Sequence, residues 1–122
     1  MHSKTFKTFD VVLVPFPFVD SGITKLRPAV ILSSAAFGLK IEHHVLAMVT
    51  SAQHTPWPLD TQITNLKSAG LSKESLIRMK LFTLDERLII QKIGSLDSND
   101  QNNISDHLTN LLKSALNTPP KR

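Results

Sequence analysis

The chain contains no cysteine and no tyrosine among its 122 residues. Without cysteine, it can form neither a disulfide nor a thiolate metal site. It also has no apolar run near the ~20 residues that a membrane-spanning helix requires. Residues 1–8 lack the apolar segment of a signal peptide. These absences favour a cytoplasmic protein, and its length suits a single domain that buries about two thirds of its unfolded surface.

Positive charge is in modest excess. The formal net charge is +4 and the isoelectric point is about 9.6. Such a balance favours an anionic partner, for example a nucleic acid. Many soluble proteins carry a similar charge, so the balance by itself does not identify the partner.

Short apolar runs, separated by glycine and proline, predict a mainly β domain. Residues 11–14 are four consecutive apolar residues, and three of them are valines, as in a strand buried on both faces. Pro15 ends this strand, and Pro28 marks the start of the next, because proline cannot donate to a β-ladder. Strands are predicted near residues 10–15, 28–33, 44–50, 60–65, 75–83 and 88–93.

Two capping signatures predict helical segments. Residues 83–86 (Thr-Leu-Asp-Glu) fit a capping box before a short helical turn, and residues 98–101 (Ser-Asn-Asp-Gln) are a second such signature. After the second signature, apolar residues recur at helical spacing and predict one stripe packed against the sheet. The stripe consists of Ile104, Leu108, Leu111, Leu112, Ala115 and Leu116.

The order of these elements predicts a single domain over residues 1–122, mainly β with a C-terminal α-helix. Many short strands with one terminal helix favour a small, curled antiparallel barrel. Its core is expected to span about residues 9–116, and residues 117–122 are expected to be a disordered tail.

The segment 75–83 alternates with a period of two. Ile77, Met79 and Leu81 are expected on the core side, and Arg78 and Lys80 on the polar side. The two cations either contact phosphates or form a merely solvated face.

Arg27 is the most conspicuous candidate for a functional residue. Pro28 holds Arg27 in an extended conformation, at the rim of the β-structure and beside the polar loop of residues 20–25. The planar guanidinium matches a phosphate with two parallel hydrogen bonds. The alternative for an isolated arginine is a surface salt bridge, for instance with Asp20.

Several segments, in this order and at these spacings, together resemble the MazF/PemK family of toxin endoribonucleases from bacterial toxin–antitoxin pairs. They are residues 10–33, Val45–Ser51 with its terminal Thr-Ser, Gly70-Leu71, Ser75–Asp85, Ile93–Leu96 and the final amphipathic helix. The match covers roughly residues 9–116. Arg-Pro and Thr-Ser occur widely, so the ordered set carries the resemblance. It implies an SH3-like small barrel, the PemK/CcdB-like toxin fold.

The resemblance also implies a function. The protein would be the toxin of a type II toxin–antitoxin system: a metal-independent endoribonuclease that cleaves single-stranded RNA with sequence preference and leaves 2′,3′-cyclic phosphate and 5′-OH ends. It would form a homodimer, need no cofactor, and be neutralised by a small acidic antitoxin, with which it binds DNA. Because fold does not fix function, a non-catalytic binding module or a CcdB-like gyrase-inhibiting toxin is the alternative.

By this resemblance, Arg27 and Thr50 form the active centre. The Thr50 hydroxyl can donate to a non-bridging phosphate oxygen; the alternative is a strand-end hydroxyl bonded to its own backbone. An arginine pKa above about 12 makes Arg27 a poor general base, so an electrostatic role is expected.

Side chains around this centre are candidate RNA contacts. In the family, the loop of residues 20–25 closes over RNA and is touched by the antitoxin; a solvated turn is the alternative. Phe16 and Phe18 either stack on bases or pack in the core or the dimer interface. His54 is either an acid near Thr50 or a solvated loop residue. The RNA-contact candidates are Ser21, Lys25, Ser51, Gln53, Arg78 and Lys80.

No metal site is expected. Adjacent His43 and His44 point to opposite faces of a strand, and no zinc spacing appears. Some family members place a carboxylate shortly after the arginine equivalent to Arg78, whereas Met79 and Lys80 follow it here. The residues that transfer protons are therefore unassigned.

Overall fold

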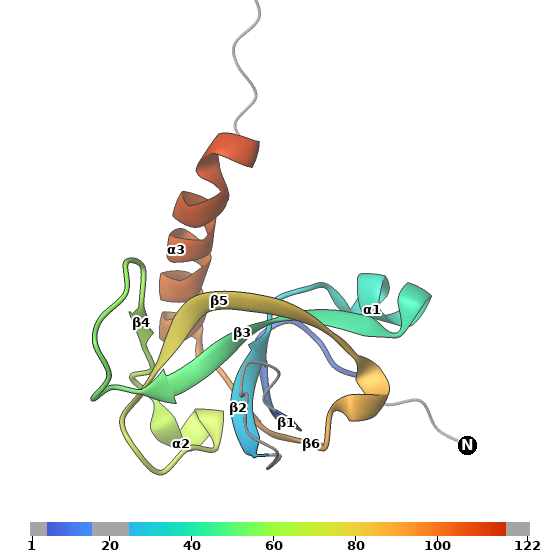
Figure 1. Ribbon diagram of the computed structural model, residues 1–122, viewed down its shortest axis with the longest axis horizontal. Helices are drawn as coiled ribbons and strands as arrows, with labels where there is room; N and C mark the ends of the chain where they lie inside the picture. The colour runs from blue at the N-terminus through green and yellow to red at the C-terminus, as the bar shows by residue number, and fades with distance from the viewer. Residues whose placement is uncertain (1–4, 16–24, 117–122) are drawn as a thin grey trace, which may run out of the picture.

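The structure is a computed structural model that describes residues 5–15 and 25–116. The described chain forms a curled, six-stranded antiparallel sheet with the strand order β4-β5-β3-β2-β1-β6, followed by one long helix (Figure 1). The strands are β1 (Asp10–Pro15), β2 (Leu26–Ile31), β3 (His43–Ser51), β4 (Thr61–Gln62), β5 (Ser75–Asp85) and β6 (Gln91–Ser95). This confirms the predicted mainly β fold class with a C-terminal helix. The expected tail, residues 117–122, lies outside the described residues.

The predicted bounds of β1 are confirmed, whereas those of β2 are shifted. β2 begins at Leu26, so Pro28 lies inside the strand and opposite Leu13 of β1. The ladder between β2 and β3 starts only at Ala29. Pro28 therefore lies beyond the β3 pairing, and its missing N–H group costs no ladder hydrogen bond.

β5 contains an irregularity that bears on the site. Ala47 of β3 pairs with Leu81, but the next residue, Met48, pairs with Arg78, so Met79 and Lys80 form a bulge. Ile77 is fully buried, and Met79 and Leu81 pack against the same core, which confirms the predicted inner side. Arg78 lies on the opposite side of the strand from Ile77, as expected, but it is only 7% exposed, so the alternative of a merely solvated side chain does not apply to it.

The helical segments include two short helices that the sequence patterns did not predict, α1 (Ala35–Ile41) and α2 (Leu66–Ala69). The predicted helical turn is the 3₁₀-helix η1 (Glu86–Leu88), but its cap is Asp85, whose carboxylate accepts a hydrogen bond from the Arg87 N–H at 2.8 Å. Thr83, the expected cap, belongs to β5.

The long helix α3 (Ser98–Leu116) also differs in its cap. Asp97, rather than Ser98, accepts a hydrogen bond from the Asp100 N–H at 2.9 Å. Only the first half of the predicted apolar stripe packs on the sheet, because Ile104 is buried whereas Leu111, Leu112 and Leu116 are exposed. Figure 1 shows the later turns of α3 extending away from the sheet.

Two hydrophobic clusters lie on the two faces of the sheet. Val11, Val30, Ala47, Ile77 and Ile104 belong to the first, beside α2 and α3. The second lies beneath η1, and its buried members are Phe6, Val12, Val14, Ala29, Ile31, Leu46, Leu84 and Ile89. Val11 enters the first cluster, whereas Val12 and Val14 enter the second, so β1 contributes to the core on both faces, as its continuous apolar run predicted. In the described part of the chain, no helix combines the length and hydrophobicity that a membrane span needs.

Candidate active site

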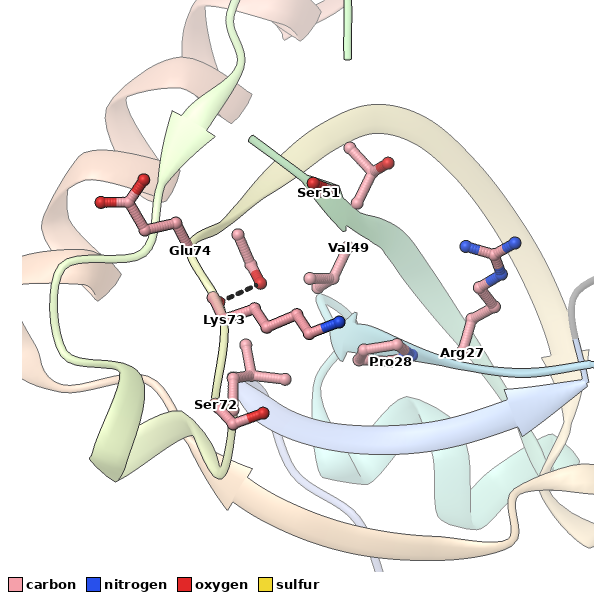
Figure 2. Close-up of a pocket in the computed structure, with 10 residues that line it drawn as sticks. Arg27, Pro28, Val49, Ser51, Ser72, Lys73 and Glu74 are labelled. Carbon is pink, nitrogen blue, oxygen red and sulfur yellow. Dashed lines mark hydrogen bonds between the residues drawn. The ribbon is translucent and has the colours of Figure 1, made fainter. Parts of the chain in front are cut away.

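A pocket of about 220 Å³ opens at the edge of the sheet where β2 begins and β3 ends. Antiparallel pairing brings these two strand ends together, so Arg27 and Pro28 lie beside Val49, Thr50 and Ser51. The opposite wall is the loop from α2 to β5, residues 71–75. The predicted pair Arg27 and Thr50 therefore lines one cavity (Figure 2).

Thr50 is a firmly held part of this wall. It pairs with Leu76 across the β3–β5 ladder and is only 6% exposed. Arg27 is half-buried on β2, opposite Val14 of β1. Both side chains thus rise from sheet positions rather than from free loops, which limits their motion.

Lys73 is a site residue that sequence reasoning missed. Figure 2 shows its side chain extended into the pocket toward Pro28 and Val49, with Arg27 beyond them. The Glu74 carboxylate lies at the rim and points away from Arg27 in the same view. The backbone of the loop is held by a hydrogen bond from Ser75 Oγ to the Lys73 carbonyl oxygen at 2.7 Å. Two cations around one small cavity suit an anionic ligand.

Gly70 directs this loop into place. It ends α2 with a φ of 74°, in the left-handed region, and its N–H group bonds back to the Lys67 carbonyl oxygen at 3.1 Å. The sequence shows a glycine followed by polar residues 72–75, which indicates a loop. Only the pairing of Ser51 with Ser75 places that loop beside Thr50, and this register cannot be read from the sequence.

A second pocket, of about 510 Å³, adjoins the first and shares Ser51, Lys73 and Glu74 with it. Its remaining lining residues are Ala52 and Gln53. The structure therefore brings two predicted RNA contacts, Ser51 and Gln53, next to the Arg27–Thr50 pocket. The Ala52 N–H group bonds to the Glu74 carbonyl oxygen at 3.3 Å and joins the two loops.

The other predicted contacts lie elsewhere. Lys25 is exposed, two residues before Arg27, whereas Lys80 is half-buried in the β5 bulge and lines neither pocket. His54 is exposed and also lines neither pocket. Four residues named above lie outside the described residues: Phe16, Phe18, Asp20 and Ser21.

Arg78 contacts protein rather than solvent. Its Nε donates to Asp60 Oδ1 at 3.1 Å, and one terminal nitrogen donates to Asp60 Oδ2 at 2.9 Å and to the Thr55 carbonyl oxygen at 2.8 Å. Burial raises the pKa of Asp60, but hydrogen bonds from Arg78 and from the Trp57 backbone, with the Arg78 charge, outweigh it and leave this pKa below its usual value.

The adjacent histidines His43 and His44 have separate partners. His44 is buried with Nε2 3.1 Å from Glu86 Oε1, whereas the His43 ring bonds to the Ile41 carbonyl oxygen, as expected for neighbours on opposite faces. Among residues 5–15 and 25–116, no group of three or more potential metal ligands occurs.

These features define a small, mainly β protein with a cationic pocket at one edge of a curled sheet. Residues 7–112 match the model of the PemK-like, MazF-like toxin of type II toxin–antitoxin systems, and the chain therefore belongs to this family. The resemblance noted from the sequence is thereby confirmed. No curated protein sequence gives a significant match.

Solved structures share the fold at low sequence identity. A MazE–MazF complex from Deinococcus radiodurans has a TM-score of 0.72 and 19% identity, with 90% of this chain and 98% of that chain covered. An endoribonuclease in complex with its cognate antitoxin, from a mycobacterial species, has a TM-score of 0.70 and 16% identity, with 93% and 98% covered. Mycobacterium tuberculosis toxin MazF-mt6 has a TM-score of 0.69 and 14% identity, with 85% and 96% covered. At these identities, the likeness establishes the fold alone.

Proposed function

We propose that the protein is an endoribonuclease that cleaves single-stranded RNA at the pocket between Arg27 and Lys73. The observation that carries this proposal is the meeting of Arg27, Thr50 and Lys73 around one cavity, in a chain of the PemK-like, MazF-like toxin family. A similar fold described as an endoribonuclease supports the same activity.

In the proposed reaction, a ribose 2′-oxygen attacks the adjacent phosphorus. The O2′–P bond forms while the P–O5′ bond breaks, so a 2′,3′-cyclic phosphate and a 5′-hydroxyl result. The 2′-hydroxyl loses its proton and the leaving 5′-oxygen gains one. No metal is required for this balance of atoms and charge.

Each pocket residue has a defined part in this chemistry. Arg27 and Lys73 would neutralise the negative charge that builds on the phosphate oxygens, and the Thr50 hydroxyl would donate to a non-bridging oxygen. The Lys73 ammonium can also release a proton to the leaving oxygen, which a guanidinium with a pKa above about 12 does poorly. The 2′-hydroxyl proton passes to water, because the Glu74 carboxylate of the pocket lining lies at the rim and points away from Arg27.

The proposed partners are an acidic antitoxin and a second copy of this chain. The MazE–MazF complexes among similar folds support the first. The second is supported by an apolar groove of about 390 Å³ between α1 and α3, which includes Phe37, Leu108 and Leu112. Large apolar side chains on these helices are 38–64% exposed: Phe37, Leu39, Ile41, Leu111, Leu112 and Leu116. Light scattering at micromolar concentration should therefore give the mass of a dimer.

The decisive experiment for activity is cleavage of a long RNA by the purified protein in EDTA, followed by mapping of the cut ends. Cleavage with 5′-hydroxyl ends is expected, and Arg27→Ala should remove it whereas Lys40→Met, an exposed lysine on α1, should not. Activity that is lost in EDTA and restored by a divalent metal would contradict the mechanism. Intact RNA together with inhibition of gyrase would place the protein in the other toxin class.

A further inference from the structure

Arg78 and the loop that joins β3 to β4 form a buried clamp. The guanidinium holds the carboxylate of Asp60 and the carbonyl of Thr55 at once, through the three hydrogen bonds described above. The Arg78 and Asp60 side chains are only 8% and 11% exposed. Trp57 covers the group, since its ring centre lies 4.9 Å from Arg78 Cζ.

The loop is itself folded around this clamp. The Trp57 N–H group donates to Asp60 Oδ2 at 2.8 Å, and the Asp60 N–H group donates to the Trp57 carbonyl oxygen at 3.3 Å. The Arg78 side chain thus fixes residues 55–60, the part of the loop that is farther from Thr50 in the sequence. The near part is held by the Gln53 N–H bond to Ser51 Oγ at 3.2 Å and by the Ala52 bond to the Glu74 carbonyl oxygen.

The clamped loop begins next to the site. Arg78 pairs with Met48, two residues before Thr50, and the loop leaves β3 directly after Ser51. Its first residues, Ala52 and Gln53, line the 510 Å³ pocket together with Ser51, Lys73 and Glu74. The amide of Gln53 and the carboxylate of Glu74 are groups that hydrogen-bond to base edges.

We propose that Arg78 is a positioning residue, which fixes the loop of residues 52–60 so that the 510 Å³ pocket accepts one nucleobase beside the scissile phosphate. Arg78 would thereby set which RNA sequence is cut without touching RNA itself. This inference rests on the proposed ribonuclease function and deepens it. It also gives Arg78 a different role from the direct phosphate contact expected from the sequence.

A purely stabilising role is the competing explanation, and selectivity separates the two. The measured quantity is the ratio of kcat/KM for an RNA with the preferred cleavage sequence to that for an RNA changed at one base beside the cut. Partial unfolding lowers both values equally, because the same folded molecules cut both RNAs. The ratio therefore responds to the shape of the pocket and not to the folded fraction.

The variants are Arg78→Lys, which keeps the charge but loses the fork, and Asp60→Asn and Trp57→Ala, which alter the loop side. Trp57 is 43% exposed, so its removal should leave the fold intact. Arg87→Met is the matched control: it breaks the Arg87–Asp85 pair near the end of β5, where the Arg87 side chain is 82% exposed. Hydrogen exchange of residues 52–60 is measured on the same proteins.

Each clamp variant should lower the selectivity ratio by about 10-fold to 100-fold, since small misplacements of a binding wall cost this much. Exchange in residues 52–60 should become faster, and Arg87→Met should change neither quantity. A wild-type ratio in Arg78→Lys and Asp60→Asn would overturn the inference and leave the ribonuclease proposal standing. If the wild-type protein cuts no RNA, both the ribonuclease proposal and this inference are refuted. Faster exchange of residues 52–60 in the clamp variants would then show only that Arg78 holds the loop.

Discussion

Gly70→Ala should destabilise the protein and move the loop that carries Lys73. Gly70 is the C-cap of α2 and has a φ of 74°, which L-residues other than glycine seldom adopt. A Cβ added at this position would lie 2.0 Å from the Ile93 carbonyl oxygen and 2.7 Å from the Ile93 carbonyl carbon, both in β6. Since these atoms are backbone, they cannot rotate away, so α2 and β6 must separate.

The two effects add. The left-handed conformation costs alanine roughly 1–2 kcal/mol, and forcing an extra methyl into a packed contact costs about 1–3 kcal/mol. The free energy of unfolding should therefore fall by about 2–5 kcal/mol, a large share of the 5–15 kcal/mol typical of a domain. The displaced loop should also reduce RNA cleavage, because Leu71 and Lys73 line the pocket immediately after Gly70.

Urea unfolding of wild type, Gly70→Ala and Gly70→Asn measures this cost. Asparagine tolerates the left-handed conformation but still carries a Cβ, so similar losses in both variants would assign the effect to the clash with Ile93. Ser72→Ala, an exposed position in the same loop, should lie within about 0.5 kcal/mol of wild type. A Gly70→Ala protein as stable as the wild type would refute the reasoning.

Three further predictions concern charged residues. Arg27→Ala should lower kcat about 10²–10³-fold with an unchanged unfolding transition. Arg27→Lys should recover only part of the rate, because an ammonium lacks the bidentate fork of a guanidinium. A fully active Arg27→Ala protein would exclude the proposed catalytic centre. Lys73→Met should reduce the slope of log binding constant against log salt concentration by roughly 0.7, the value for one phosphate contact on single-stranded RNA. Lys40→Met is the control and should keep the wild-type slope. The same slope in Lys73→Met would show that Lys73 does not contact RNA. The folded-state pKa of Asp60 lies below its usual value, so ionised Asp60 stabilises the fold above about pH 4, and this stabilisation is lost as pH falls through the folded-state pKa. Asp60→Asn should therefore remove this part of the pH dependence of the free energy of unfolding. Acid unfolding curves with the same pH dependence in both proteins would contradict the prediction.

Parts of the fold followed directly from sequence patterns. β1 has the predicted bounds, because Asp10 and Pro15 enclose four apolar residues, of which the sheet buries the three valines. The side of β5 that faces the core was also predictable. The bulge adds two residues, Met79 and Lys80, and two residues keep the alternation of side chains in phase, so Ile77 and Leu81 face the same side. The meeting of Arg27 and Thr50 was expected from the family resemblance, and the strand pairing supplies its physical cause.

Other features depend on contacts that no local pattern records. The alternating pattern of residues 75–83 predicts that Arg78 points away from the core. The pattern does not show that Asp60, in a separate loop, pairs with Arg78 and buries its charge. The stripe of α3 has helical spacing throughout, yet periodicity does not tell which part packs on the sheet and which part stays exposed. The sequence did not indicate that Lys73 lies in the pocket, because the pairing of Ser51 with Ser75, rather than proximity in the sequence, brings the Lys73 loop next to Thr50.

The positive charge of the chain therefore has to be assigned residue by residue. The Arg78 charge is matched by Asp60 in a buried pair, and the Arg87 charge by Asp85 at 2.6 Å on the surface. Around the candidate site, Arg27 and Lys73 are the cations of the pocket lining, and they stand on opposite walls. A phosphate between them would contact the Arg27 guanidinium on β2 and the Lys73 ammonium on the α2–β5 loop. In the proposed reaction, β2 would therefore set the orientation of the phosphate, and this loop would supply the proton. In the proposed function, Arg27 and Lys73 would bind the scissile phosphate, whereas the loop that Arg78 holds would select the base.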